Sequence, residues 1–124
     1  MAYPPDHFTE EMASFPIEGN IIDHTWPFIV TTLSGKPDTR AVFILAYLYS
    51  IPNISEIYIE TSYGLLMDIT GSNKLQIRKA FANLERLGFC DINKKNKRSK
   101  NLFVRLNKRE LSDRRMDFLR TRSL

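Results

Sequence analysis

The stretch GSNKLQIRKAFANLERLGF, residues 71–89, carries the clearest structural signal in the chain. Asn73 stands where a helix N-cap belongs, and Gln76 three positions later completes the reciprocal capping pattern, in which each side chain satisfies an otherwise free backbone N–H. Gly88 supplies the left-handed residue that commonly ends a helix. The sequence therefore predicts a helix over residues 73–87.

The apolar side chains of this helix recur at the i, i+3, i+4, i+7 spacing of one buried stripe. That stripe consists of Ile77, Ala80, Phe81, Leu84 and Leu87. At about 100° per residue, the opposite face is expected to hold Leu75, Lys79, Ala82 and Arg86, with Lys74 and Arg78 on one flank and Gln76 and Asn83 on the other. We expect the stripe to be core and the other faces to meet solvent or a ligand.

Two further helices are predicted before this one. Apolar residues recur at helical spacing over residues 20–33, where Pro27 would have to lie near a start or a kink. Asp38 is placed to cap a second helix, which runs to about Tyr49 and is apolar almost all round, as in a central helix. Residues 1–19 show neither a helical nor a strand period, so we expect an irregular arm there.

A short strand and a brief helix are predicted between the central helix and residue 71. The strand is EIYIE, residues 56–60, with its two isoleucines on one side. Thr61 or Ser62 is placed to cap the brief helix. The side chains expected to point inward from that helix are Leu65, Leu66 and Ile69.

The last third of the chain predicts a β-hairpin and a terminal helix. Two short β-prone runs, FCDIN (89–93) and LFVRLN (102–107), are joined by KKNKRSKN (94–101), a long loop that is expected to project as a basic tip. Residues 108–120 then have helical spacing with a narrow apolar edge. The predicted fold class is therefore mainly α with a small β-hairpin.

The positive charge of the chain is concentrated in one segment. The net charge of the 124 residues is +4. Residues 1–72 have two basic and nine acidic residues, a net charge of −7, whereas residues 73–109 have twelve basic and two acidic residues, a net charge of +10. Residues 110–124 add +1. A clustered positive field favours a polyanionic partner, and the alternative is an ordinary solvated surface.

The run LLMDITGSNKLQIRKAFANLERLGFCDINKK, residues 65–95, resembles the winged helix-turn-helix DNA-binding domain family. The likeness lies in a short helix, a glycine-containing turn, a polar-capped recognition helix and the exit Leu-Glu-x-Leu-Gly-aromatic into the wing. It spans about residues 56–106. Thr70 departs from the family pattern, which usually has an aliphatic residue before the turn glycine.

The resemblance implies a winged helix-turn-helix with extra N-terminal and C-terminal helices. We divide the chain into an irregular N-terminal arm (1–19), the winged helix-turn-helix domain (20–106) and a C-terminal helix (107–124) that is a candidate for dimerisation.

The predicted DNA contacts lie in two places. The first turns of the recognition helix would reach base edges in the major groove, where Arg or Lys suits guanine and Gln suits adenine, while its N-terminal amides meet phosphate. These residues are Asn73, Lys74, Gln76, Arg78 and Lys79. The wing would contact the backbone or the minor groove through Lys94, Lys95, Lys97, Arg98 and Lys100. The alternatives are a solvated helix face for Arg78 and Lys79, and a localisation signal or a merely soluble loop for the basic residues of the wing. Leu75 would touch a thymine methyl or pack against a neighbour.

Several other classes of site are not supported by the sequence. His7 and His24 have no Cys or His partner at metal-ligand spacing, so no metal or cofactor is expected. SGKP at residues 34–37 lacks the first glycine and the hydroxyl residue of a phosphate loop, and no nucleophile elbow marks a catalytic centre, so we expect no enzyme. The longest apolar run has nine residues, too short for a membrane span. A single cysteine, Cys90, and the absence of a signal-like start favour the cytoplasm.

The sequence leaves three functional hypotheses open. The first is a double-stranded DNA-binding transcriptional regulator that acts as a homodimer, joined either by the terminal helix through Leu111, Phe118 and Leu119 or by the early helices through Trp26 and Phe28. The second is a winged-helix protein-interaction module in a larger assembly. The third is a DNA-binding protein of plasmid or phage replication or partition. No polar cluster indicates a small-molecule effector.

Overall fold

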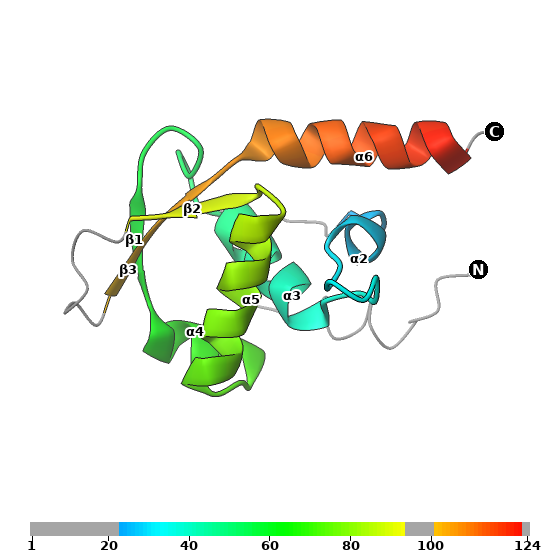
Figure 1. Ribbon diagram of the computed structural model, residues 1–124. Helices are drawn as coiled ribbons and strands as arrows, with labels where there is room; N and C mark the ends of the chain where they lie inside the picture. The colour runs from blue at the N-terminus through cyan, green and yellow to red at the C-terminus, as the bar shows by residue number, and fades with distance from the viewer. Residues whose placement is uncertain (1–22, 94–100, 123–124) are drawn as a thin grey trace.

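The computed structural model describes residues 23–93 and 101–122 (Figure 1). In this part of the chain it is a small mixed α/β domain, mainly helical, with five helices and a three-stranded antiparallel sheet. The predicted arm of residues 1–19 lies outside the described residues. The described elements follow the predicted order. The structure corrects the length of the first helix, the start of the first strand and the position of Leu65 on the brief helix.

The first helix is shorter than predicted. Helix α2 spans Trp26–Ile29, with Pro27 in its first turn, and the helix predicted over residues 20–33 is wrong beyond Ile29. The chain turns back there, because Thr31 forms a β-bridge with Pro37 across a turn at Gly35, whose φ of 84° favours glycine. Backbone N–H and C=O groups that the predicted helix would have paired within itself form hydrogen bonds across this turn instead.

Helix α3, Thr39–Tyr49, is the central helix, as predicted. The Asp38 side chain accepts a hydrogen bond from the backbone N–H of Ala41 at 3.1 Å and so caps its start. Six of its eleven residues are buried, and it packs against α2, α4 and α5. Its nearly continuous apolar surface is explained by these neighbours on several sides.

The first strand begins later than predicted. Strand β1 spans Ile59–Ser62 rather than residues 56–60, and Ile57 is 54% exposed instead of packing beside Ile59. The reason is a turn in the preceding loop, where Asn53 has a φ of 63° and its carbonyl accepts hydrogen bonds from the N–H groups of Glu56 and Ile57. The chain becomes extended only after that turn.

The sheet has the order β1-β3-β2. Strands β2, Cys90–Ile92, and β3, Asn101–Leu106, form the predicted hairpin, and β1 pairs antiparallel with the other edge of β3. Ser62 at the end of β1 lies opposite Asn101 at the start of β3. The middle strand β3 therefore links the hairpin to the segment that leads into the next helix.

Helix α4, Tyr63–Thr70, follows β1 directly and is capped by the Ser62 hydroxyl, which accepts from the backbone N–H of Leu65 at 3.1 Å. Leu66 is fully buried, but Leu65 is 41% exposed, so the prediction that Leu65 points inward is wrong. Adjacent helical positions lie about 100° apart. On α4, which contacts α3, α5 and β1, the position of Leu66 faces these neighbours and that of Leu65 faces away from them.

Helix α5, Lys74–Arg86, agrees with the prediction at its start, along its buried stripe and at its end. Gly71 (φ 67°) closes α4, and Gly88 (φ 82°) follows α5. Helix α6, Lys108–Arg122, crosses the top of the domain in Figure 1 and packs on α2, where the rings of Phe28 and Phe118 stack with centroids 5.3 Å apart.

Candidate nucleic-acid interface

The first turns of α5 present their side chains to solvent. The buried stripe of α5 packs on α3 and α4, so the opposite face points away from the domain. Lys74, Arg78 and Lys79 are exposed, and Leu75 between them is 58% exposed. Leu75 therefore does not pack into the protein. A large apolar side chain and three cations share one accessible surface.

The three cations of this surface have no acidic partner among the residues that the structure describes. Within the described part of the chain, none of Lys74, Arg78 and Lys79 forms an ion pair, and Lys74 Nζ lies 5.0 Å from the ring centroid of Tyr63 on α4. The first turn of α5 contains no acidic residue. Helix dipoles favour anions at this end by about 0.3–1 kcal/mol each, so a lysine at the first position opposes helix stability.

Asn73 and Gln76 form the predicted capping box. The backbone N–H of Asn73 donates to Gln76 Oε1 at 3.0 Å, and the backbone N–H of Gln76 donates to Asn73 Oδ1 at 2.9 Å. A two-bond contact from Gln76 to adenine needs Oε1 as an acceptor. Such a contact would therefore compete with the cap, which sequence reasoning did not foresee.

The second half of α5 is used to hold the chain before α3. Asn83 Nδ2 donates to the backbone oxygen of Thr31 at 3.0 Å and to Asp38 Oδ2 at 2.9 Å. Arg86 Nη2 donates to the same Thr31 oxygen at 2.7 Å. The sequence predicted Arg86 on the face of α5 opposite the buried stripe. In the structure its side chain is exposed but forms hydrogen bonds within the protein. Cations free to meet a ligand on α5 are thus confined to its first half.

The five predicted wing contacts, Lys94, Lys95, Lys97, Arg98 and Lys100, lie outside the described residues. The described ends of the hairpin are fixed, since the Asn93 N–H donates to the Phe103 oxygen at 2.8 Å and Asn101 lies opposite Ser62. Asn101 also bonds to Glu60 through its side chain. The hairpin therefore leaves the sheet at the end where β1 passes into α4. Figure 1 shows the start of β3, then α4, then the start of α5 following one another along the lower side of the domain.

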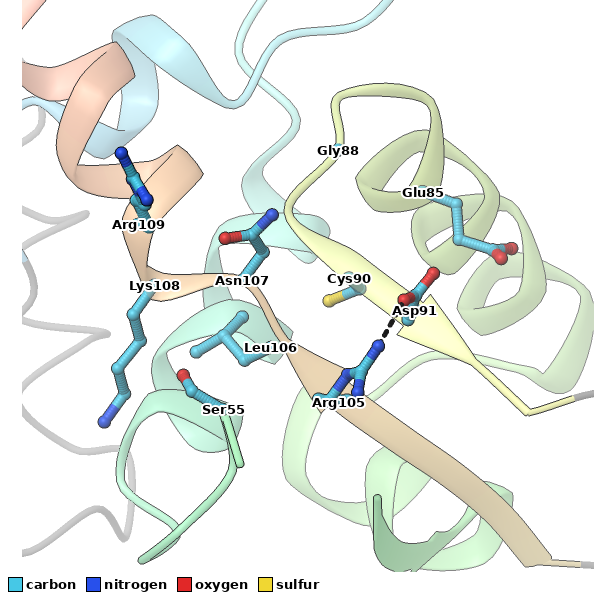
Figure 2. Close-up of a pocket in the computed structure, with 10 residues that line it drawn as sticks. All are labelled: Ser55, Glu85, Gly88, Cys90, Asp91, Arg105, Leu106, Asn107, Lys108 and Arg109. Carbon is cyan, nitrogen blue, oxygen red and sulfur yellow. Dashed lines mark hydrogen bonds and ion pairs between the residues drawn. The ribbon is translucent and has the colours of Figure 1, made fainter. Parts of the chain in front are cut away.

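A separate pocket of about 430 Å³ lies between β2, β3, the loop at Ser55 and the start of α6 (Figure 2). Its charges are mixed. Arg105 forms an ion pair with Asp91 at 3.1 Å. Lys108 Nζ lies 4.6 Å from the ring centroid of Tyr49, a residue that is not part of the pocket lining. The described lining has three basic and two acidic residues, so its net charge is smaller than that of the three cations on α5.

Cys90 at this pocket is buried, which disfavours ionisation of its thiol. Burial, together with the carboxylates of Glu85 and Asp91, raises the pKa of its thiol far above the ordinary value. The reactive form of cysteine is the thiolate, so the thiol is chemically quiet. Residues 23–93 and 101–122 also contain no group of three or more His, Cys, Asp or Glu side chains that could hold a metal ion.

The two surfaces predicted for a dimer are largely used within the chain. Trp26 and Leu111 are buried in the core, and Phe118 stacks on Phe28. Met116 on α6 is 49% exposed and belongs to neither predicted set. The predicted apolar edge of α6 is therefore mainly its contact with α2.

Comparison of the chain with protein-family models, curated proteins and solved structures gives no match. Among the helices that the structure describes, none has the length and apolar character needed to cross a bilayer.

Proposed function

We propose that this chain is a winged helix-turn-helix protein that binds double-stranded DNA sequence-specifically, as a transcriptional regulator acting as a homodimer. The observation that carries the proposal is the set of three exposed cations on the first turns of α5, which have no acidic partner among residues 23–93 and 101–122. The proposal treats α4 and α5 as the helix-turn-helix, α5 as the recognition helix and the β2–β3 hairpin as the wing.

The arrangement of elements supports this assignment. A short helix, a turn closed by Gly71 and a second helix with a polar cap precede the hairpin, and β1 joins the hairpin edge to edge in the order β1-β3-β2. This small sheet stands beside α5 instead of covering its start. A helix presented in this way can enter a groove without meeting its own domain.

The chemistry of α5 suits the major groove of B-form DNA, which is about 12 Å wide and admits one α-helix. Arg78 and Lys79 would donate to guanine O6 and N7, or to flanking phosphates, and each good bidentate base contact gives about 1–3 kcal/mol of discrimination. Leu75 would contact a thymine methyl. Lys74 and the free backbone N–H groups at the start of α5 would meet phosphate.

The wing would add contacts with the DNA backbone or minor groove through its five basic residues, from Lys94 to Lys100. If six phosphates are neutralised in all, the logarithm of the association constant falls against the logarithm of the salt concentration with a slope of roughly −5. This slope is the quantitative form of the proposal.

The test is a titration of a labelled random-sequence duplex at several salt concentrations. It compares the unaltered chain with a variant in which Lys94, Lys95, Lys97, Arg98 and Lys100 are all changed to Gln. Steep salt dependence that becomes shallower in the variant supports DNA binding. Weak binding that is indifferent to salt and to the five changes would favour the protein-interaction module.

Selection from random duplex pools then tests sequence specificity. Enrichment of two half-sites about 34 Å apart, one turn of DNA, would support a dimer with two recognition helices. A role in replication or partition shares the same DNA contact, so the proposal for α5 holds under that role as well.

A further inference from the structure

A groove of about 660 Å³ runs beside α5, between that helix and the turn of residues 32–34, and reaches the start of α3. We propose that this groove is a second DNA-contact surface, which holds one sugar–phosphate strand next to the major groove that α5 enters. The inference rests on the proposed function and extends it to the turn of residues 32–34 and to the start of α3, which lie outside residues 56–106, the span of the sequence resemblance.

The position of the groove follows from the geometry of a helix in DNA. A helix in the major groove has a phosphate backbone on each side. On one side of α5 lies α4, whose Tyr63 is under Lys74. On the other side lie Gln76, Asn83 and the turn of residues 32–34, which together line the groove. A duplex centred on α5 would bring its second backbone to this side.

The wall of the groove is built before any ligand arrives. The Thr32 N–H donates to the Lys36 oxygen at 2.8 Å, and the Gly35 N–H donates to the Thr32 oxygen at 2.9 Å, which closes the turn. The base of the turn is bonded to α5 through Asn83 and Arg86. A preformed surface binds without the entropic cost of ordering a loop.

The charges of the groove fit a polyanion. Arg40, Lys79 and Arg86 line it, and Asp38 is the one acidic residue among the described residues that do so. Both oxygens of Asp38 already accept hydrogen bonds, Oδ1 from the Ala41 N–H and Oδ2 from Asn83. The acid is therefore satisfied by the protein, whereas the groove keeps an excess of positive charge.

The remaining lining suits the other parts of a nucleotide strand. The Thr32 and Ser34 hydroxyl oxygens lie 2.9 Å apart, so one hydroxyl donates to the other and the second proton can be donated to a phosphate oxygen. Leu33 at the rim is 85% exposed, and Ala82, which is also exposed, lies along the helix side. These apolar groups offer contact to the carbon faces of deoxyribose.

The test places one negative charge at the groove and the same charge elsewhere. In Ser34→Glu the carboxylate stands at the exposed rim of the groove. In the matched control, Ser112→Glu, it stands on an exposed position of α6, at the end of the domain away from the start of α5 (Figure 1). Both variants lower the net charge by one, and neither removes a buried side chain.

We expect Ser34→Glu to weaken binding of a random-sequence duplex by about tenfold, because a carboxylate beside phosphate is repelled. Ser112→Glu should bind as the unaltered chain does. Arg40→Gln, which keeps a donor for its hydrogen bond to Ser72, should make the salt slope shallower by about 0.9, the value for one lost phosphate contact. Circular dichroism melting of each variant checks that the domain remains folded.

The outcomes separate the two proposals. Equal weakening of DNA binding by Ser34→Glu and Ser112→Glu would show an effect of net charge alone and would overturn the assignment of the groove to DNA contact. Loss of binding on replacing Arg78 and Lys79, with no effect of Ser34→Glu and Arg40→Gln, would also overturn it while leaving DNA binding through α5 intact. If the unaltered chain does not bind duplex DNA at all, the proposed function fails and the groove fails with it.

Discussion

Replacing Lys74, Arg78 and Lys79 together by Gln should change how DNA binding responds to salt without unfolding the protein. The three side chains are exposed and have no ion pair within the described part of the chain. Gln has nearly the same helix propensity as Lys and Arg. The free energy of unfolding should therefore stay within about 0.5 kcal/mol of the original value, as is usual for surface changes.

The size of the effect on binding follows from counterion release. Each phosphate contact contributes about −0.9 to the log–log salt slope, so if Lys74, Arg78 and Lys79 each neutralise one phosphate, their loss should make the slope shallower by about 2.7. Between 50 and 200 mM salt, a fourfold change, the unaltered chain should then lose about 40-fold more affinity than the variant does. Fluorescence anisotropy of a labelled duplex at four or five salt concentrations measures both slopes.

A matched triple variant controls for net charge. Changing Arg109, Arg120 and Arg122 on α6 to Gln removes the same charge from the opposite end of the domain, and it should shift the slope by much less. A slope of the α5 variant equal to that of the unaltered chain would refute the assignment of this surface to phosphate. Equal shifts in both triple variants would refute it as well, since position would then not matter.

Three further predictions concern stability and are checked by urea unfolding. Asn73→Ala removes the cap of α5 and should lower the free energy of unfolding by about 1 kcal/mol. Asn83→Ala removes the donor of Asp38 Oδ2 and leaves the Thr31 oxygen bonded to Arg86 alone, so it should cost about 1–3 kcal/mol, whereas a loss below about 0.5 kcal/mol would contradict its role as a tether. Burial opposes ionisation of Asp23, but hydrogen bonds from Thr25 and Arg115 hold the pKa of its carboxyl below 3.8. The ionised carboxylate therefore stabilises the fold above that pH, and this stability is lost as the pH falls through the lower pKa of the folded state. Between about pH 5 and pH 3 the unaltered chain should accordingly lose more stability than Asp23→Asn, and equal losses would contradict the assignment.

The helix with the most local information was predicted residue by residue. The cap at Asn73, the apolar stripe and the stop at Gly88 are all encoded within residues 71–89, so no distant contact was needed to place α5. The exposure of Lys74, Arg78 and Lys79 followed from the same periodicity.

The errors arose where distant contacts or turns override a local pattern. Helix α2 stops at Ile29 because Thr31 pairs with Pro37, although the helical spacing of apolar residues continues to Leu33. The use of Arg86 as a tether depends on a carbonyl 55 positions away in the chain, which no spacing within α5 reveals. The groove beside α5 depends on the same pairing and was not foreseen.

Because of the capping box, the polar groups that the start of α5 offers to a ligand are mainly hydrogen-bond donors. Because the side-chain oxygens of Asn73 and Gln76 each accept a hydrogen bond within the cap, the polar groups of this surface that the cap does not engage are N–H groups, from two amide nitrogens, two lysines and Arg78. Such a surface matches bases that offer two acceptors side by side, and in the major groove that base is guanine. We therefore expect the half-sites selected from a random pool to be guanine-rich at the positions that α5 contacts. The frequency of adenine there should rise only in variants that release Gln76 from the cap.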